Sequence, residues 1–309
     1  APTVRRVALP PCPDAPARLG PCLGPAALPR APRPLAALLL LALTLTLTGC
    51  AGGSGRQYRE HAADLAAASG LAPVFLPAGP WRLAGFARNG PGEVLTVYIE
   101  GDGRAFVDRR TPSADPTPAE PLGLLLARRD PAVKLLVLAR PGQYLPAEEL
   151  AGYDPALWTQ ARYSPQVVAA LGQALDAAKD RFGANRLRLR GYSGGGALAV
   201  LVAAERTDVD DIVTVAANLD TEAWTSLHGV SPLRLSRNPA DAAPALAGLP
   251  QTHYVGALDT VTPPALCRRY LARLPADAPA RCLVIEGAGH HEGLVKAWEG
   301  IMGQSGLSP

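Results

Sequence analysis

The pattern Gly-x-Ser-x-Gly occurs once in the chain, at residues 191–195, with Ser193 at its centre. Residues 186–192 alternate apolar and basic side chains, as in a strand, and residues 195–208 are mostly small and apolar, as in a buried helix. A serine on a sharp strand-to-helix turn exposes its hydroxyl for attack on an acyl carbon, and glycines beside it leave room for the turn. We therefore interpret Ser193 as a candidate nucleophile. The alternative is a glycine-rich turn without chemistry.

A serine hydroxyl needs a base to accept its proton, and the chain has five histidines. Of these, His290 and His291 follow the last expected strand, residues 281–287. The carboxyl ends of parallel strands are where such sheets place functional side chains. Only one of two adjacent side chains can point inward. We prefer His290 because it ends the turn Gly-Ala-Gly-His, and His291 stays as the alternative.

The base in turn needs a carboxylate that fixes its tautomer and stabilises its charged form. Asp259 follows the expected strand 252–257 and completes the chain order serine, acid, histidine. Asp220, after the expected strand 211–217, is the rival acid. We predict that Asp259 is the acid of a catalytic triad.

The anion that forms during acyl transfer needs backbone N–H donors. Gly194 supplies one directly after the serine, and the loop after the expected strand 93–100 supplies a second. That loop contains Glu-Gly-Asp-Gly at residues 100–103. We assign the second donor to Asp102, with Gly103 equally placed. We expect the Asp102 side chain to turn away from the site, because its charge would repel the anion.

Strand-like and helix-like segments alternate through the second two thirds of the chain, which predicts parallel strands with crossover helices in a doubly wound α/β sheet. Expected strands cover residues 93–100, 133–140, 186–192, 211–217, 252–257 and 281–287. Expected helices cover residues 121–130, 164–183, 195–208, 263–274 and 292–302. Residues 73–90 contain two short strand-like pieces and predict an antiparallel hairpin at the N-terminal edge. Residues 221–250 interrupt the alternation and predict a small lid.

The first 49 residues have the features of an export leader. Residues 1–34 are rich in proline and arginine and predict disorder, and residues 35–49 contain an apolar run that is too short to span a membrane as a helix. The end of this run, Leu-Thr-Gly-Cys at residues 47–50, resembles a bacterial lipobox. That resemblance implies that Cys50 carries a lipid such as palmitate and anchors the protein to a membrane.

The leader sets the expected domain boundaries and location. We expect residues 50–72 to form a tether and residues 73–309 to form the folded domain. The small residue Ala51 after Cys50 resembles the arrangement sorted to the outer membrane. We therefore expect a lipid-anchored protein of the cell envelope, at the outer membrane or on the periplasmic side.

Charge and cysteine content narrow the functional classes. The formal net charge is +3, but the leader has five arginines against one aspartate, which leaves the remainder near −1 and argues against nucleic acid as a partner. In an exported domain, Cys267 and Cys282 are a candidate disulfide. No Cys and His cluster has metal-ligand spacing, so we predict no metal site.

Taken together, the serine, aspartate and histidine motifs resemble the α/β-hydrolase superfamily over residues 73–302. The segments "YIEGDGRAF", "LARPGQY" and "VTVAANLD" further resemble a group of bacterial lipoproteins with this fold. The resemblance implies an α/β-hydrolase fold and acyl chemistry without a cofactor. Glu100 and Gly101 stand where esterases of this superfamily usually have His-Gly.

We expect an exported serine hydrolase that acts on an ester or a similar small acyl substrate. An exported peptidase or amidase is a second hypothesis, because the same triad cleaves amides. A binding module without activity on the same fold is a third. Labelling by a fluorophosphonate separates the enzymes from the binding module.

Overall fold

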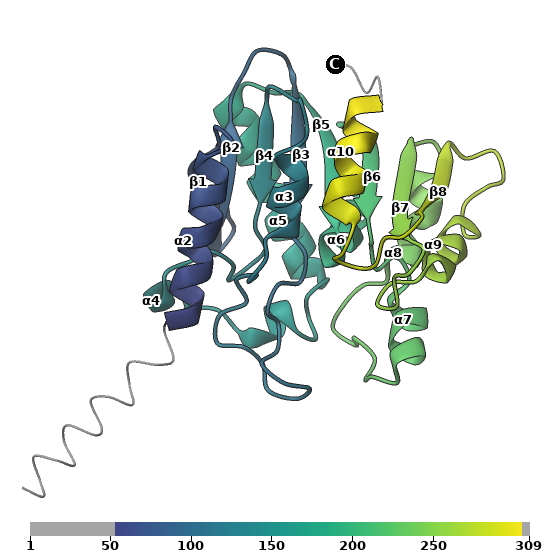
Figure 1. The fold of residues 1–309 in the computed structure, drawn as a ribbon, viewed down its shortest axis with the longest axis horizontal. Coiled ribbons are helices and arrows are strands. Elements are labelled where there is room, and N and C mark those ends of the chain that lie inside the picture. The colour runs from purple at the N-terminus through teal and green to yellow at the C-terminus, as the bar shows by residue number, and fades with distance from the viewer. Residues whose placement is uncertain (1–52, 305–309) are drawn as a thin grey trace, which may run out of the picture. The chain divides into compact units, whose positions relative to one another are not determined.

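The computed structural model describes residues 53–304, and Figure 1 shows their arrangement. The predictions for the leader, including lipidation of Cys50, lie outside these residues. Within residues 53–304, no helix is long and apolar enough to cross a membrane.

Eight strands form one sheet in the order β1-β2-β4-β3-β5-β6-β7-β8. The strands are β1 (Ala72–Ala78), β2 (Trp81–Arg88), β3 (Val94–Ile99), β4 (Leu135–Leu138), β5 (Arg186–Tyr192), β6 (Val209–Val215), β7 (Gln251–Gly256) and β8 (Ala280–Ile285). β1 pairs with β2 and β2 with β4 in antiparallel fashion, and the other neighbours are parallel. The predicted α/β class, including its antiparallel N-terminal edge, is confirmed.

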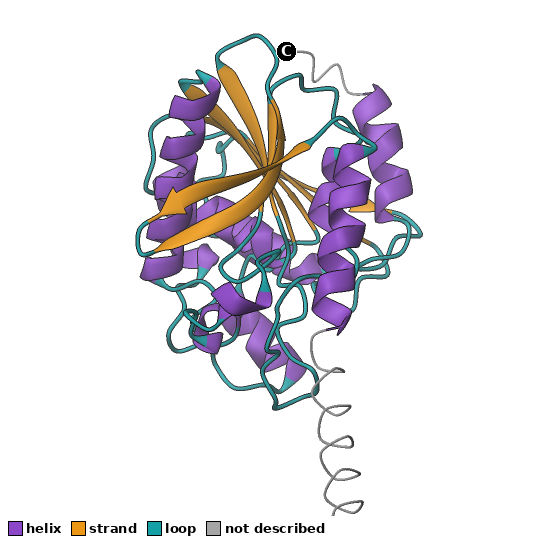
Figure 2. Cartoon of the chain, turned by 90° about the vertical axis from the view of Figure 1, so that its left-hand side faces the viewer, coloured by secondary structure: helices purple, strands orange, loops and turns teal. Residues whose placement is uncertain are grey.

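Helices cover both faces of the sheet (Figure 2). The helices are α2 (Gly53–Ala67), α3 (Leu122–Ala127), α4 (Ala147–Leu150), α5 (Pro165–Phe182), α6 (Gly194–Ala203), α7 (Thr221–His228), α8 (Pro239–Ala242), α9 (Pro264–Leu271) and α10 (Leu294–Gln304). One core forms between the sheet and α5, α6, α8 and α9, and the second forms between the sheet and α2, α3 and α10. Successive side chains of a strand alternate between these two cores, as Val97 and Tyr98 do, because the side-chain period of a strand is two.

The segment expected to be a tether contains a helix instead. α2 begins at Gly53 and packs through Ala62 and Ala66, which are both fully buried. The glycines at positions 52, 53 and 55 led to the prediction of a flexible linker, but Ala62 and Ala66 are four residues apart and so lie on one helix face. The folded domain therefore begins about 20 residues earlier than predicted, as the difference between 73 and 53 shows.

The segment expected to be a lid forms α7, α8 and a 3-10 turn at Ala243–Leu246. Asp220 begins α7 as its N-cap by accepting a hydrogen bond from the backbone N–H of Ala223. Gly229 ends the helix in the left-handed conformation with a φ of 60°. This segment follows the carboxyl end of β6, so α7 lies at the edge of the sheet that carries Ser193.

Candidate active site

Ser193 lies on the turn between β5 and α6, with φ 50° and ψ −118°. This backbone conformation is strained for a residue with a Cβ, and the packing around the turn holds it in place. A Cβ on Gly191 would lie 2.4 Å from the carbonyl oxygen of Gly195, and a Cβ on Gly195 would lie 2.2 Å from that of Ile99. Glycine is therefore required at both positions for the chain to turn this sharply.

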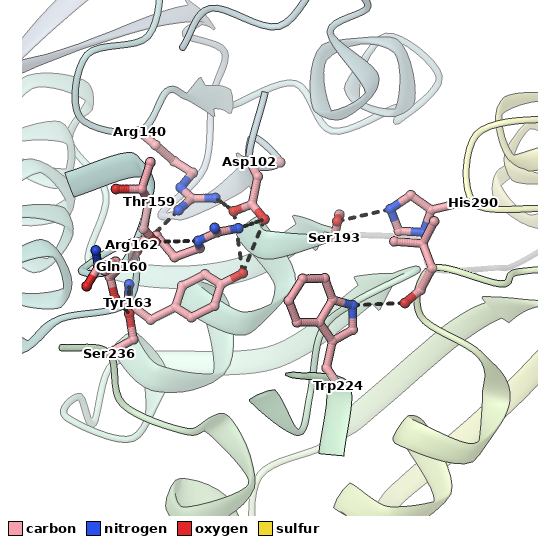
Figure 3. Close-up of polar contacts among 12 residues, drawn as sticks. Asp102, Arg140, Thr159, Gln160, Arg162, Tyr163, Ser193, Trp224, Ser236 and His290 are labelled. Atoms are coloured by element: carbon pink, nitrogen blue, oxygen red, sulfur yellow. Dashed lines mark hydrogen bonds and ion pairs between the residues drawn. The ribbon is translucent and has the colours of Figure 1, made fainter. Parts of the chain in front are cut away.

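His290 is the histidine that the structure brings to the serine. Its Nε2 lies 3.1 Å from Ser193 Oγ, in the loop after β8 (Figure 3). The adjacent His291 points elsewhere, with its Nδ1 2.8 Å from the hydroxyl of Tyr192. That hydroxyl donates to the carbonyl oxygen of His290 at 3.0 Å and so fixes the base-carrying loop.

Asp259 lies on the far side of the imidazole, with Oδ2 2.9 Å from His290 Nδ1. Its other oxygen accepts hydrogen bonds from the backbone N–H groups of Val261 and Thr262 at 2.8 and 2.7 Å. Burial favours the neutral acid, but the hydrogen bond and charge of His290 together with the Thr262 bonds outweigh it and hold the pKa of Asp259 below its usual value. The carboxylate is thus kept ionised next to the imidazole.

The rival acid, Asp220, has a different role in the structure. Its carboxylate caps α7 and forms an ion pair with Arg269, at 3.0 Å between Oδ2 and Nε. Asp259 is therefore the carboxylate that reaches His290.

Thr262 is a site residue that the sequence reasoning missed. Its hydroxyl lies 2.9 Å from Asp259 Oδ2, 2.9 Å from the carbonyl oxygen of Ala216 and 3.2 Å from His290 Nδ1. It therefore holds the acid and the base together and links both to the end of β6. A threonine three residues after an aspartate is the only sequence signal, and it is equally typical of an ordinary turn.

The buried side chain of Glu100, which is 1% exposed, fixes the loop at residues 100–103. Its carboxylate accepts hydrogen bonds from the backbone N–H groups of Gly123 and Leu124 at the start of α3, and from the hydroxyl of Tyr144, each at 3.0 Å. Burial raises the pKa of Glu100 despite these bonds. Glu100, which stands where esterases usually have histidine, thus fixes the loop to α3.

Asp102 lies beside the nucleophile turn and does not turn away from it. A Cβ on Gly194 would lie 2.1 Å from Asp102 Oδ1. Arg140 and Arg162, which are 3% and 8% exposed, both form ion pairs with this carboxylate (Figure 3). Burial opposes ionisation, but the two guanidinium groups outweigh it and lower the pKa of Asp102 to about 2. The predicted repulsion is therefore offset by two cations.

The backbone donors next to Ser193 are the N–H groups of Gly194 and of Asp102. Within residues 53–304, no backbone carbonyl accepts a hydrogen bond from either. Gly103 has a φ of 62°, and a Cβ there would lie 2.1 Å from the carbonyl oxygen of Pro116, so this residue packs against the following segment of the loop. Of the two donors left open by the sequence, Asp102 is thus the one whose residue contacts Gly194.

A disulfide joins Cys267 in α9 to Cys282 in β8, with 6.3 Å between their Cα atoms. α9 follows the loop that carries Asp259, and β8 leads into the loop that carries His290. The disulfide therefore connects the supports of the acid and of the base.

Among residues 53–304, no three His, Cys, Asp or Glu side chains are grouped so that they could hold a metal ion. A cavity of about 560 Å³ lies between α7 and residues 232–242, and none of the triad residues lines it.

The chain is similar to known proteins in structure, but no sequence comparison finds a match. No protein-family model matches the chain, and no curated protein sequence matches it. An α/β serine hydrolase homologue from Coxiella burnetii has a TM-score of 0.52 at 15% identity, over 75% of this chain and 95% of that one. Est1E from Butyrivibrio proteoclasticus has a TM-score of 0.52 at 12% identity, over 74% and 97%. Puromycin hydrolase has a TM-score of 0.54 at 20% identity, over 75% of this chain and 38% of its own.

At these identities the similarities establish how the chain is folded. The site itself contains a strained serine, a histidine within hydrogen-bond distance of it and a buried carboxylate next to that histidine.

Proposed function

Since the chain has the α/β-hydrolase fold, we propose that it is a serine hydrolase that acts on an ester or a similar acyl substrate. The proposal rests on two hydrogen-bond distances: 3.1 Å between Ser193 Oγ and His290 Nε2, and 2.9 Å between His290 Nδ1 and Asp259 Oδ2. Hydrogen bonds of this length allow the proton transfers that acyl transfer requires.

In the acylation step, His290 Nε2 takes the hydroxyl proton while Ser193 Oγ attacks the acyl carbon. Asp259 fixes the histidine with its proton on Nδ1 and stabilises the positive charge that the ring acquires. The tetrahedral intermediate collapses when the ester C–O bond breaks. The departing alkoxide takes the proton from Nε2 and leaves as an alcohol, and the acyl group stays on the serine.

In the deacylation step, water takes the place of the alcohol. His290 Nε2 removes a proton from the water, which attacks the acyl carbon, and the same proton then returns to Ser193 Oγ as the acid leaves. Both steps pass through an anion on the former carbonyl oxygen. We assign its two donors to the N–H groups of Gly194 and Asp102, which the intramolecular backbone bonds leave unused.

We further propose that the enzyme is exported and held in the cell envelope by a lipid on Cys50, at the outer membrane or on the periplasmic side. The support is the order of an apolar run, the lipobox-like residues 47–50 and a folded domain that begins at Gly53. The disulfide between Cys267 and Cys282 is consistent with an oxidising compartment.

The direct test compares wild type with Ser193→Ala on short-chain aryl esters and with a fluorophosphonate probe. We expect the wild type to turn over the esters and to be labelled, and the variant to lose labelling and at least about a thousandfold in kcat. A wild type that is folded but neither labelled nor active would reject the enzyme and favour the binding module.

An amide substrate is the second candidate, because puromycin hydrolase shares the fold of this chain and the triad chemistry is the same for both leaving groups. Matched ester and anilide substrates with one acyl group separate the two. A higher kcat/KM for the anilides would replace the esterase assignment with an amidase one.

A further inference from the structure

Exposed apolar side chains gather at the edge of the sheet that carries Ser193. They lie in three segments that follow the carboxyl ends of β3, β6 and β7. Their exposed fractions range from 37% to 67%. We call them the apolar rim: Phe106, Val107, Leu227, Val230, Leu258 and Val261.

The segments that carry the rim are fixed by hydrogen bonds. Phe106 forms an antiparallel bridge with Pro112, and the backbone N–H of Val107 donates to the carbonyl oxygen of Thr111 at 3.0 Å. These contacts close a hairpin with both apolar side chains near its tip. The exposure of Phe106 and Val107 therefore follows from an ordered turn.

α7 and the acid-carrying loop are joined at one carbonyl group. The indole N–H of Trp224 and Nε2 of His228 lie 2.9 and 2.8 Å from the carbonyl oxygen of Val261. This connection holds the rim residues at the end of α7 next to those that flank Asp259. Part of the rim therefore lies on α7 and part on the loop that carries Asp259.

Basic residues accompany the apolar ones at the hairpin. Arg109 and Arg110 are exposed at its tip. The neighbouring Asp108 uses its carboxylate for the turn, accepting from the backbone N–H groups of Arg110 and Thr111 at 2.8 and 2.9 Å. Exposed apolar side chains beside arginines suit a surface of anionic lipid headgroups over acyl chains.

The folded domain begins at this same edge. In the first turns of α2, Arg59 forms an ion pair with Asp115 at 3.0 Å, and the Arg104 guanidinium lies 5.0 Å from the centre of the Tyr58 ring. Both partners belong to the loop that follows β3 and carries the hairpin. Figure 1 shows the start of α2 and α7 toward the same end of the molecule.

The chain length before α2 limits where an anchor can act. Cys50 precedes Gly53 by three residues. Three residues span at most about 10 Å, so a lipid on Cys50 would hold the domain close to the membrane by the edge at which α2 begins.

We propose that the apolar rim docks on the lipid bilayer that holds the Cys50 anchor, and that the substrates are acyl esters of the bilayer's own lipids. This inference rests on the proposed hydrolase function and names its substrate class. The rim, the arginines and the entry point of the chain all lie at the edge of the sheet that carries the half-buried Ser193. A lipid ester would therefore reach the serine from the bilayer without crossing water.

The first test measures docking without using activity. The full-length chain is placed in vesicles of phosphatidylethanolamine and phosphatidylglycerol that contain a doxyl-labelled lipid, with Val107→Trp compared with Val133→Trp. Both valines are 55% exposed, but Val133 precedes the amino end of β4 at the opposite edge of the sheet. We expect the lipid to quench the added tryptophan at position 107 at least about threefold more than the one at 133, relative to the parent chain.

The second test measures the ratio of two activities in the same vesicles: release of fatty acid from bilayer phospholipid and hydrolysis of a soluble aryl ester. We expect Val107→Asp to lower this ratio at least about tenfold, because moving one apolar side chain out of an apolar environment changes an equilibrium by about that factor. We expect Val133→Asp to leave the ratio unchanged.

The outcomes separate the inference from the function on which it rests. Equal quenching at positions 107 and 133, with the soluble ester still cleaved, overturns docking and leaves the hydrolase intact. Quenching at 107 without any ester hydrolysis rejects the hydrolase and retains docking. If Val107→Asp instead converts a dimer to a monomer in detergent, the rim is an interface between copies of the chain and the inference is wrong.

Discussion

Arg140 forms an ion pair with Asp102 directly beside the Cα of Gly194, the residue after the proposed nucleophile. The guanidinium is 3% exposed, and Arg162 contacts the other oxygen of the same carboxylate at 2.9 Å. An aspartate next to a developing anion would by itself raise the energy of the transition state. With two arginines around it, the cluster has one net positive charge.

Replacement of Arg140 by glutamine tests this balance. We expect kcat to fall about 30- to 1000-fold with little change in KM, because a unit charge a few ångströms from the anion is worth about 2–4 kcal/mol at an effective dielectric constant near 20. Steady-state kinetics on an aryl ester measures this. Arg82→Gln, which breaks the exposed ion pair with Glu149, is the matched control and should leave kcat unchanged. Equal kcat values for the two variants would contradict the electrostatic role.

Glu100 tests how the loop beneath Asp102 is held. Glu100→Gln presents an amide N–H₂ to donors that need an acceptor, so we expect the free energy of unfolding to fall by about 1–3 kcal/mol and kcat to fall with it. Tyr144→Phe removes only one of the three bonds and should cost about 0.5–1.5 kcal/mol. Urea unfolding followed by the tryptophan signal measures both. If the tyrosine variant is the less stable of the two, the carboxylate is not the support of the loop.

The strands and helices could be predicted because the spacing of apolar residues within each segment indicates which of the two it forms. The alternation of apolar residues gave the strands and crossover helices, and chain order then placed Ser193, Asp259 and His290 at one edge. Spacing alone could not decide between His290 and His291, because their orientation depends on the Tyr192 hydroxyl, which contacts both residues.

What the sequence did not reveal depends on contacts between distant segments. Arg140 and Arg162 meet Asp102 only because β4 and the segment before α5 end beside β3. An arginine in a loop is usually solvated, and nothing local distinguishes these two. The helix α2 was missed because its glycines resemble a linker locally, whereas Ala62 and Ala66 pack against the sheet and α3.

His253 predicts how the stability of the domain depends on pH. The ring is 1% exposed, and its Nδ1 lies 2.9 Å from the hydroxyl of Thr214. Burial lowers the pKa of His253 from 6.5 to about 3. The folded state therefore binds this proton less readily than the unfolded state does, so the stabilising contribution is complete above pH 6.5 and is lost as the pH falls toward 3.

We expect the free energy of unfolding to fall by up to about 1.4 kcal/mol per pH unit from this one group, between pH 6 and 4. In His253→Gln, which does not titrate, the slope over the same range should be smaller by about that amount. Denaturant unfolding at a series of pH values measures it. Parallel curves for the two proteins would show that the histidine is not held neutral.

The disulfide between Cys267 and Cys282 closes a loop with a sequence separation of 15. A disulfide that closes a loop of this size contributes about 2–4 kcal/mol to the free energy of unfolding, so the double variant Cys267→Ala, Cys282→Ala should be less stable by that amount. Dithiothreitol should reproduce the loss in the wild type and have no effect on the double variant. Unfolding of the wild type that is insensitive to reduction would contradict the prediction.

Thr262 makes three contacts through a single hydroxyl, so its replacements separate positioning from packing. Thr262→Val keeps the volume but removes the hydroxyl, whose one proton is shared between Asp259 Oδ2 and the carbonyl oxygen of Ala216, and Thr262→Ser keeps the hydroxyl but loses the methyl group. Since a hydrogen bond to a charged group contributes about 1.5–3 kcal/mol, we expect the valine variant to lose about tenfold or more in kcat.

Loss of a donor to the carboxylate also raises the pKa of Asp259, which is held low in part by Thr262. The activity of the valine variant should therefore decline at a higher pH than that of the wild type when the medium is acidified. The serine variant should retain the wild-type profile of kcat against pH, because the bond to Asp259 persists. If the valine and serine variants give the same profile, the threonine acts through packing alone and has no part in fixing the acid to the base.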